Sequence, residues 1–271
     1  MANAWAMRPL PISAASSTST SAGAGTSPDN VRNDWMGVVW KTAAGPTTIS
    51  LDIDLGSAQE VDAALLFGCT GATAAWTLRV RGADDAGFTT NVYVSAVVPF
   101  LAGSEMPTHG RGVGWWTKDD GAISRRYWRF TIAGVLASEQ VTVGRVAIGK
   151  RNILERNFAF GGGWGIRDLG RVEWSPYGVM LRRRAARLRA LGITFPNVRK
   201  DEVEQKVQPL IEMNAGQEPI VLVTDPAPDP QRQKRSWFGP IVGELGTVWR
   251  AATGWEWRVN LVDLVPIPKA G

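Results

Sequence analysis

The stretch Ile49-Ser-Leu-Asp-Ile-Asp-Leu-Gly56 decides the fold expected for the first half of this 271-residue chain. Its apolar and polar side chains alternate with a period of two, which is typical of a strand with one buried face. The same alternation occurs in Trp76-Thr-Leu-Arg-Val-Arg81 and in Arg125-Arg-Tyr-Trp-Arg-Phe-Thr-Ile132, and Val143-Gly-Arg-Val-Ala-Ile-Gly149 follows the latter. Glycine-rich turns separate these stretches, and residues 1–150 contain no amphipathic helix pattern. The pattern therefore predicts an antiparallel β-sandwich.

A short motif before the first strand adds to this pattern. Trp40-Lys-Thr42 places a tryptophan, a basic residue and a small hydroxyl residue shortly before Asp54-Leu-Gly56. In order and spacing, residues 12–149 resemble discoidin-type, galactose-binding-like domains. This resemblance implies a jelly-roll sandwich over residues 1–149 whose loops at one end bind ligands. The tract 13–27, almost entirely Ser, Thr, Ala and Gly, is either a flexible linker or an ordered loop over that end.

The second half of the chain has a different pattern. A glycine cluster in Phe158-Ala-Phe-Gly-Gly-Gly-Trp-Gly165 interrupts the strands, so we interpret residues 150–165 as a linker and 166–271 as a second domain. Its expected elements are a strand at 171–175, a turn at 175–178, a strand within 181–195, a helix over 200–214 that Pro209 interrupts, a buried strand at 219–224, a proline-rich connection at 225–231 and a last strand at 255–261.

The order of these elements resembles the belt domain of siphophage distal tail proteins over residues 165–266. That resemblance implies a β-sandwich or split barrel with one helix, whose copies form a hexameric ring between the tail tube and the tip hub of a virion. A galactose-binding-like module is a frequent companion of this domain. The main hypothesis is therefore a structural protein of a phage tail tip or baseplate, assembled in the host cytoplasm. The alternatives are a carbohydrate-binding module that attaches to a host glycan and a tail-associated polysaccharide hydrolase.

The charge balance by itself names no partner. Thirty Lys and Arg against 25 Asp and Glu give a formal net charge of +5, which is mild for a chain of this size and makes nucleic acid an unlikely partner. Five arginines are nevertheless concentrated in one stretch: Arg182, Arg183, Arg184, Arg187 and Arg189. They are interpreted as ion-pair partners of Glu202 and Glu204 on an adjacent protomer, as a solvated strand face, or as a phosphate-binding site. Because no aromatic residue is interleaved with them, the intersubunit interpretation is preferred.

Groups for catalysis are scarce. With one histidine, His109, and one cysteine, Cys69, any Ser-His-Asp triad would need His109, and neither an internal disulfide nor a cysteine-built zinc site is available. Cys69 lies in an apolar run and is expected to be buried, whereas His109 is expected in a mobile surface loop. The carboxylate pairs that a glycosidase needs have simpler explanations as solvent-facing strand residues or turn residues: Asp52 and Asp54, Asp84 and Asp85, Asp119 and Asp120. We expect a protein that is not an enzyme and that holds no cofactor and no metal.

Thirteen tryptophans are the most informative excess in the composition. Most lie in strand patterns and are expected to pack in the core. Trp35, Trp115 and Trp116 are expected in loops, beside carboxylates, amides and lysines that suit a stacked sugar ring; contact with a neighbouring tail subunit is the preferred alternative. The chain has no run of 18 apolar residues and no leader pattern, so we expect a soluble protein made in the cytoplasm, with no membrane as a partner.

Overall fold

The computed structural model describes residues 3–214, 216–243, 246–251 and 254–267. It is mainly β, its strand pairs are antiparallel, and it divides into two compact units. Unit 1 comprises Met1–Ile153 and Val221–Ser236, and unit 2 comprises Leu154–Ile220 and Trp237–Gly271. The predicted fold class is confirmed. No helix among the described residues is long and apolar enough to cross a lipid bilayer.

Unit 1 holds most of the strands and two 3₁₀ helices. The strands are β1 (Trp5–Met7), β2 (Ala14–Ser17), β3 (Trp40–Lys41), β4 (Thr48–Val61), β5 (Ala63–Thr70), β6 (Thr77–Ala83), β7 (Tyr93–Val94), β8 (Val98–Pro99), β9 (Arg111–Thr117), β10 (Ile123–Ala133), β11 (Thr142–Val143), β12 (Arg145–Gly149), β13 (Arg151–Ile153) and β18 (Ile220–Val223). The 3₁₀ helices are η1 (Pro28–Arg32) and η3 (Arg232–Arg235).

The core of unit 1 lies between a sheet of order β2-β4-β10-β6-β7 and a sheet of order β12-β5-β9. The alternation predicted for β4 is confirmed, because Leu51 and Ile53 are buried while Asp52 and Asp54 are partly exposed. Trp128 of β10 pairs with Ile53 on one side and with Gly82 of β6 on the other. A Cβ atom at Gly82 would lie 3.2 Å from the Trp128 ring, so glycine here makes room for the indole. Cys69 is buried as predicted, and burial raises the pKa of its thiol to about 12.

The small-residue tract at 13–27 is an ordered loop. Ala14–Ser17 forms β2 beside β4, and Ser21 forms an isolated bridge with Thr42. The Ser27 hydroxyl accepts a hydrogen bond from the Asp29 N–H (3.3 Å) and so caps η1. Of the two interpretations of this tract, the structure confirms the ordered one.

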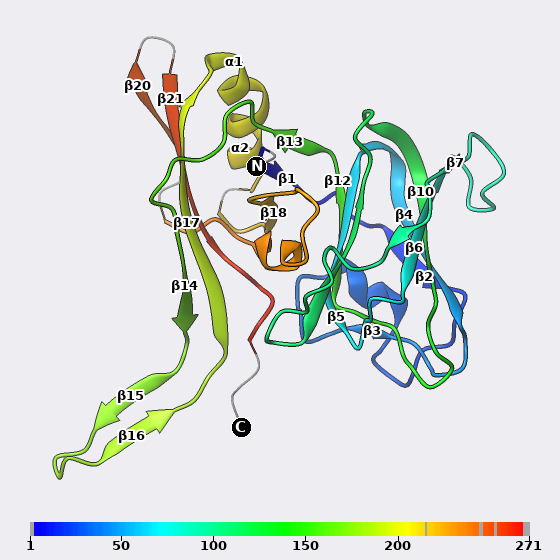
Figure 1. Cartoon of the computed structure of the whole chain (residues 1–271), viewed down its shortest axis with the longest axis horizontal. Coiled ribbons are helices and arrows are strands. Elements are labelled where there is room, and N and C mark those ends of the chain that lie inside the picture. The colour runs from blue at the N-terminus through cyan, green and yellow to red at the C-terminus, as the bar shows by residue number, and fades with distance from the viewer. Residues whose placement is uncertain (1–2, 215, 244–245, 252–253, 268–271) are drawn as a thin grey trace. The chain divides into compact units, whose positions relative to one another are not determined.

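A segment from late in the sequence completes unit 1. Residues Val221–Ser236, here called the strap, belong to this unit, although the sequence placed them in the second domain. The strap begins in β18, which pairs with β1 (Trp5 opposite Val223), and β1 in turn pairs with β13. Figure 1 shows orange β18 next to dark-blue β1. The expected domain ranges of 1–149 and 166–271 are therefore corrected, because backbone pairing joins segments more than 200 residues apart in the chain.

Unit 2 contains a four-stranded sheet of order β14-β17-β21-β20 and a separate hairpin of β15 and β16. Its strands are β14 (Gly163–Asp168), β15 (Arg171–Trp174), β16 (Met180–Arg183), β17 (Arg187–Val198), β19 (Ser236–Gly239, which begins at the last residue of unit 1), β20 (Thr247–Ala251) and β21 (Gly254–Val262). The interpretation of 150–165 as a linker is wrong, because 151–153 form β13 and β14 begins at Gly163. The predicted turn at 175–178 connects β15 to β16, and the Gly178 N–H donates to the Ser175 carbonyl (3.0 Å).

The predicted helix over 200–214 is confirmed as one helical stretch of three parts. These are α1 (Lys200–Glu202), a π-helical turn η2 (Val203–Val207) and α2 (Gln208–Asn214). Proline lacks an N–H and its ring clashes with the carbonyl four residues earlier in a regular α-helix. The wider turn directly before Pro209, with the Gln208 N–H donating to the Val203 carbonyl, accommodates that ring. Val203, Val207 and Leu210 are buried, as their spacing predicts.

Candidate functional site

A hollow of about 470 Å³ lies at one end of the unit 1 sandwich. The hollow lies at the carboxyl end of β5, at Gly68 and Thr70. The amino end of β5 follows directly on β4, through the short link at Val61–Ala63. Its lining comes from the loop before β3, the end of β5, the start of β9 and the loop before β11: Met36, Gly37, Val39, Lys41, Gly68, Thr70, Gly71, Arg111, Glu139, Gln140 and Thr142. We call it the loop-end hollow.

Buried contacts hold the loop that forms one wall of the hollow. The Arg145 guanidinium donates to the Val31 carbonyl (3.1 Å) and forms an ion pair with Asp34 (3.1 Å). The Asn30 amide donates to the Val39 carbonyl (2.9 Å). Met36 between these anchors is buried. The wall is therefore fixed by the fold of the unit itself, which is what a preformed binding site requires.

Two cations and one carboxylate line the hollow. Arg111 is half-buried and donates through Nη1 to the Met36 carbonyl (3.3 Å), and burial lowers the pKa of its guanidinium, which remains protonated at neutral pH. Lys41 is partly exposed. The Glu139 carboxylate accepts hydrogen bonds from the Leu136 N–H (2.9 Å) and from Trp76 Nε1 (2.9 Å). These two donors lower the pKa of Glu139, so it is an anion at neutral pH.

Trp35 lies in a loop, as predicted, and is directly followed by two residues of the hollow's lining, Met36 and Gly37. Its side chain is 75% exposed. The Trp35 N–H donates to Asn33 Oδ1 (2.9 Å), and its carbonyl accepts from the Val38 N–H (2.8 Å). The backbone of this loop is thus held while the indole stays in contact with solvent.

The prediction that Trp115 and Trp116 lie in a loop is wrong, because both belong to β9 and are only 6% and 2% exposed. Trp116 packs in the sandwich core against Trp128, with ring centroids 5.7 Å apart. Trp115 faces the other way, towards Trp5 at 5.8 Å and the Arg232 guanidinium of the strap at 4.5 Å. Since β9 is covered on both faces, neither indole offers a free face to a sugar ring.

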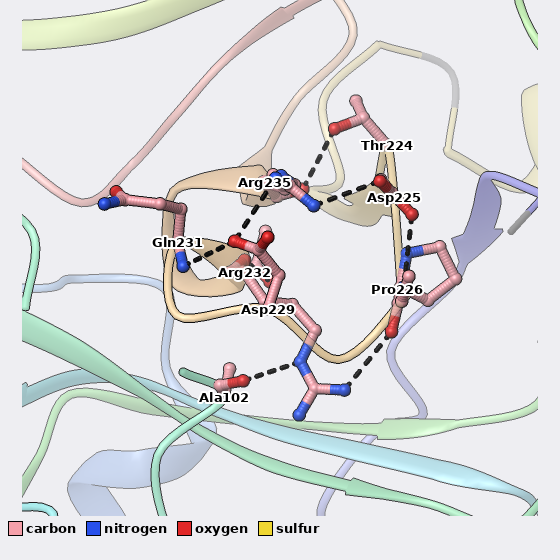
Figure 2. Close-up of polar contacts among 10 residues, drawn as sticks. Ala102, Thr224, Asp225, Pro226, Asp229, Gln231, Arg232 and Arg235 are labelled. Atoms are coloured by element: carbon pink, nitrogen blue, oxygen red, sulfur yellow. Dashed lines mark hydrogen bonds and ion pairs between the residues drawn. The ribbon is translucent and has the colours of Figure 1, made fainter. Parts of the chain in front are cut away.

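The strap holds its position over β9 through its own polar network (Figure 2). Arg232 donates through Nε to the Ala102 carbonyl (2.6 Å) and through Nη1 to the Pro226 carbonyl (3.2 Å). Arg235 forms ion pairs with Asp225 (3.0 Å) and Asp229 (3.3 Å). A second hollow of about 620 Å³ lies between the strap and β9, with Trp115 and Trp116 in its lining. Their burial makes them part of its packed wall.

Two of the residues predicted for an intersubunit interface have partners inside unit 2. Arg189 forms an ion pair with Asp263 and lies 4.3 Å above the Trp237 ring. Burial raises the pKa of Asp263, although Arg189 opposes this shift. Glu202 is buried, accepts from the Glu155 N–H (2.8 Å) and pairs with Lys206 (3.1 Å). For Arg189 and Glu202 the interface prediction is therefore corrected.

The other residues predicted for that interface lie at or near the surface of unit 2. Arg182 and Arg184 are exposed, Arg187 is partly exposed, and exposed Glu204 lies 3.7 Å from Lys200. Their proposed contacts with an adjacent protomer remain predictions.

The candidate carboxylate pairs have partners nearby. Arg129 donates to both oxygens of Asp52 (2.7 and 2.7 Å), and Arg126 donates to those of Asp54 (2.8 and 2.9 Å). The turn residues bond locally, as predicted for Asp85, which accepts from the N–H groups of Thr89 and Thr90. The remaining contacts are Asn91 to Asp84, Arg151 to Asp119 and Lys118 to Asp120. The predicted loop residue His109 is partly buried and accepts from the Arg111 N–H (3.2 Å).

Sequence reasoning did not select Arg111, Glu139 or Gln140 as site residues. Lys41 contributed to the fold prediction, as the middle residue of Trp40-Lys-Thr42, but it was not predicted to bind a ligand. Arg111 follows Gly110 at the start of β9, and Glu139 lies in the loop between β10 and β11. Nothing in the local sequence distinguishes these residues from ordinary loop polar groups, because the folded sandwich alone brings them together.

The chain was compared with family models, curated proteins and solved structures. No family model and no curated protein matches. Among solved structures, chitosan-binding module 1 from a Paenibacillus sp. IK-5 chitosanase/glucanase has a TM-score of 0.41 at 19% identity, covering 52% of this chain and 98% of the module. The family 32 carbohydrate-binding module of Clostridium perfringens NanJ, in complex with galactose, has a TM-score of 0.40 at 15% identity, with coverage of 52% and 98%. A further family 32 module from C. perfringens, in complex with GalNAc-β-1,3-galactose, has a TM-score of 0.40 at 12% identity, covering 52% and 99%.

The likeness to carbohydrate-binding modules covers half of this chain and nearly the whole of each module. The resemblance of residues 165–266 to distal tail proteins stays a hypothesis.

Proposed function

We propose that unit 1 binds a carbohydrate in the loop-end hollow. The observation that carries this proposal is the convergence of Arg111, Glu139 and Gln140 on one preformed hollow, with the exposed indole of Trp35 in the adjoining loop. Its volume of about 470 Å³ lies within the ~300–1,000 Å³ typical of sites for small ligands. Sugar rings need both kinds of group, because their C–H faces stack on an indole while their hydroxyls exchange hydrogen bonds with polar side chains.

The test is binding of soluble oligosaccharides to the full chain, first by glycan array and then by calorimetry on the strongest ligand. We expect Trp35→Ala and Gln140→Ala each to weaken binding about tenfold, which corresponds to about 1.4 kcal/mol. Trp164→Ala is the matched control, because Trp164 of β14 is 73% exposed but lies in unit 2. Soluble ligands keep any multivalent contribution out of the measurement. Equal losses in all three variants, or no glycan bound by the parent chain, contradict the proposal.

A second function, self-assembly, is favoured by the exposed surface of unit 2. The pairing of β14 with β17 continues through Leu169 N–H to Ala186 O (3.0 Å) into the β15–β16 hairpin (Figure 1). Residues 163–192 thus make one long arm, which is two-stranded beyond Arg187, where the pairing of β17 with the 260–267 segment ends. Large apolar side chains are exposed along it: Trp164, Ile166, Leu169, Val172, Trp174, Tyr177, Val179, Met180 and Leu181. An apolar surface of this extent is unusual on a monomer and typical of an interaction site.

The partner proposed for this arm is a second copy of the chain. The four-stranded sheet has β14 at one edge and β20 at the other, and within the described residues neither outer edge is paired. A head-to-tail contact that covers the arm of each copy generates a ring when the rotation between successive copies closes. A ring in a virion tail, bound to tail-tube and tip proteins, is the biological role proposed for such an assembly.

Sedimentation of the full chain over a range of concentrations tests assembly. We expect a discrete oligomer that Val172→Glu converts to a monomer, since a buried unpaired charge is costly. Val97→Glu is the matched control, because Val97 of unit 1 and Val172 of the arm are both 59% exposed. A parent chain that stays monomeric at high concentration rules out self-assembly, and electron micrographs of an oligomer show whether it is annular.

A further inference from the structure

Within the described residues, the cations of the loop-end hollow have no carboxylate partner. Many arginines on the strands of unit 1 have a carboxylate partner: Arg126 with Asp54, Arg129 with Asp52, Arg145 with Asp34 and Arg151 with Asp62. Arg111 differs, because within the part of the chain that the structure describes the one polar partner of its side chain is the Met36 carbonyl. Lys41 has no carboxylate partner among the same residues.

The carboxylate in the lining does not replace those partners. Both hydrogen bonds that Glu139 accepts go to one oxygen, Oε2, and they come from the Trp76 indole and the Leu136 N–H. Neither donor is a cation, and no ion pair joins Glu139 to Arg111 or Lys41 in the described structure. The lining therefore carries two positive charges against one negative charge, and the half-buried Arg111 is partly removed from water without a counter-ion.

We infer that the loop-end hollow selects acidic sugars, with Arg111 and Lys41 binding a carboxylate on the sugar ring. A guanidinium presents five N–H donors in a planar fork that matches the two oxygens of a carboxylate, and Arg111 uses one of them on Met36. The ligand's charge would supply the counter-ion that the described residues do not provide. Gln140 and Thr70 are then the lining groups available for ring hydroxyls.

This inference rests on the proposed carbohydrate binding and specifies its substrate class. Uronic acids and sialic acids both carry a ring carboxylate at neutral pH, so they share the chemistry that Arg111 recognises. A neutral sugar of the same shape would leave Arg111 without a counter-ion. Discrimination between the two is therefore the measurable property that separates an acidic-sugar site from a general sugar site.

The experiment measures calorimetric affinities of the full chain for two matched pairs of probes. The pairs are trigalacturonate with its methyl ester, and sialyllactose with lactose. We expect the acidic member of at least one pair to bind about tenfold or more tightly, as is usual for a charge-assisted pair of hydrogen bonds, and this preference to weaken as salt is added. The methyl ester removes the charge while it keeps the sugar ring and its hydroxyls.

Variants assign the preference to residues. Arg111→Gln abolishes the difference in affinity between the acidic and the neutral probe, and Lys41→Gln reduces that difference in part. Because Arg111 also contacts the Met36 carbonyl, Lys41→Gln keeps the test decisive should Arg111→Gln disturb the loop. Arg79→Gln is the control, since Arg79 is an exposed arginine of β6 outside the hollow.

Two outcomes overturn the inference, and they are distinguishable. Equal or tighter binding of the neutral probes, with no effect of salt, refutes the acidic-sugar selectivity and leaves carbohydrate binding intact. Binding of none of the four probes by the parent chain contradicts both the selectivity and the proposed function.

Discussion

Strand β9 and the β15–β16 hairpin have similar sequences and opposite surroundings. Gly112-Val-Gly-Trp-Trp-Thr-Lys118 and Gly170-Arg-Val-Glu-Trp-Ser175 both begin with a glycine and place aromatic residues beside charged or polar ones. In β9, Trp115 and Trp116 are buried on opposite faces, whereas Val172 and Trp174 of the hairpin are exposed. Whether the aromatic residues of a strand are buried or exposed thus depends on the segments that pack against the strand, and the local sequence does not determine it.

The strap accounts for the difference in burial between β9 and the hairpin. One face of β9 packs in the sandwich core, as Trp116 does against Trp128, and the other face is covered by Arg232 and by Trp5. The hairpin has no such cover among the described residues of unit 2. The comparison indicates that aromatics in β9 stabilise the fold and that those in the hairpin are available to a partner.

The largest expected effect is on the stability of unit 1. Trp115→Ala should lower the free energy of unfolding by about 3–5 kcal/mol, the usual range for truncating a buried aromatic residue. Trp174→Ala should change the same quantity by less than about 0.5 kcal/mol in the monomer, because the side chain is already exposed. Chemical denaturation followed by tryptophan fluorescence and circular dichroism measures both. A comparable loss in the two variants would break the distinction between β9 and the hairpin.

The second prediction concerns the anchor of the strap. Gln233 is fully buried; its Oε1 accepts from the Val113 N–H of β9 (2.9 Å), and its Nε2 donates to the Glu105 carbonyl (3.2 Å). Gln233→Ala leaves these backbone groups without partners, at about 1–3 kcal/mol for each buried group. We expect unit 1 to lose about 2–4 kcal/mol of stability, and hydrogen exchange in β9 to accelerate.

Gln231→Ala is the control for the strap, because Gln231 is exposed and its contact with Asp229 is made by the main-chain N–H (2.7 Å), which alanine keeps. We expect its stability to match that of the parent chain. If Gln233→Ala is as stable as this control, the strap does not hold β9, and the difference in burial between β9 and the hairpin needs another explanation.

The strands that sequence reasoning predicted correctly are those whose evidence is local. Leu51, Ile53, Trp128 and Phe130 alternate with polar residues within a few positions, and all four are buried. Cys69 could be placed in the core from its apolar neighbours alone.

What the sequence did not predict depends on contacts between distant segments. The strap reaches β9 across more than 100 residues of chain, so the local sequence around Trp115 and Trp116 predicts a loop where the fold has a covered strand. The loop-end hollow has the same origin, since Lys41, Arg111 and Glu139 come from β3, the start of β9 and the loop between β10 and β11. Whether an arginine has a carboxylate partner is likewise a property of the folded surface, which spacing along the chain does not encode.

The smallest effect on stability is expected at the outer face of β4 and β10. This face is half-exposed, and so its exposure is intermediate between that of buried β9 and that of the exposed hairpin. The hydrogen bonds from Arg126 lower the pKa of Asp54 below the ordinary aspartate value of 3.8; burial opposes the shift, and the Gly56 N–H adds to it. A carboxyl group whose pKa is lower in the folded state contributes stability above its unfolded pKa, and this stability is lost as the pH falls through the folded pKa.

Arg126→Gln should therefore destabilise unit 1 at neutral pH, and the difference from the parent chain should disappear as the pH falls below 3.8. The effect should be smaller than that of Gln233→Ala because the pair is partly exposed and screened by solvent. Denaturation curves between pH 7 and about 2 measure the difference, and NMR titration of the Asp54 carboxyl should show its pKa rising in the variant while the Gly56 N–H still holds it partly down.

Arg79→Gln, which removes an exposed arginine outside this pair, should give curves parallel to those of the parent chain at every pH. A stability difference between Arg126→Gln and the parent chain that persists below the folded pKa of Asp54 would mean that Arg126 stabilises the sheet by packing, as buried Trp115 does. The outer face of β4 and β10 would then stabilise the fold in the same way as β9.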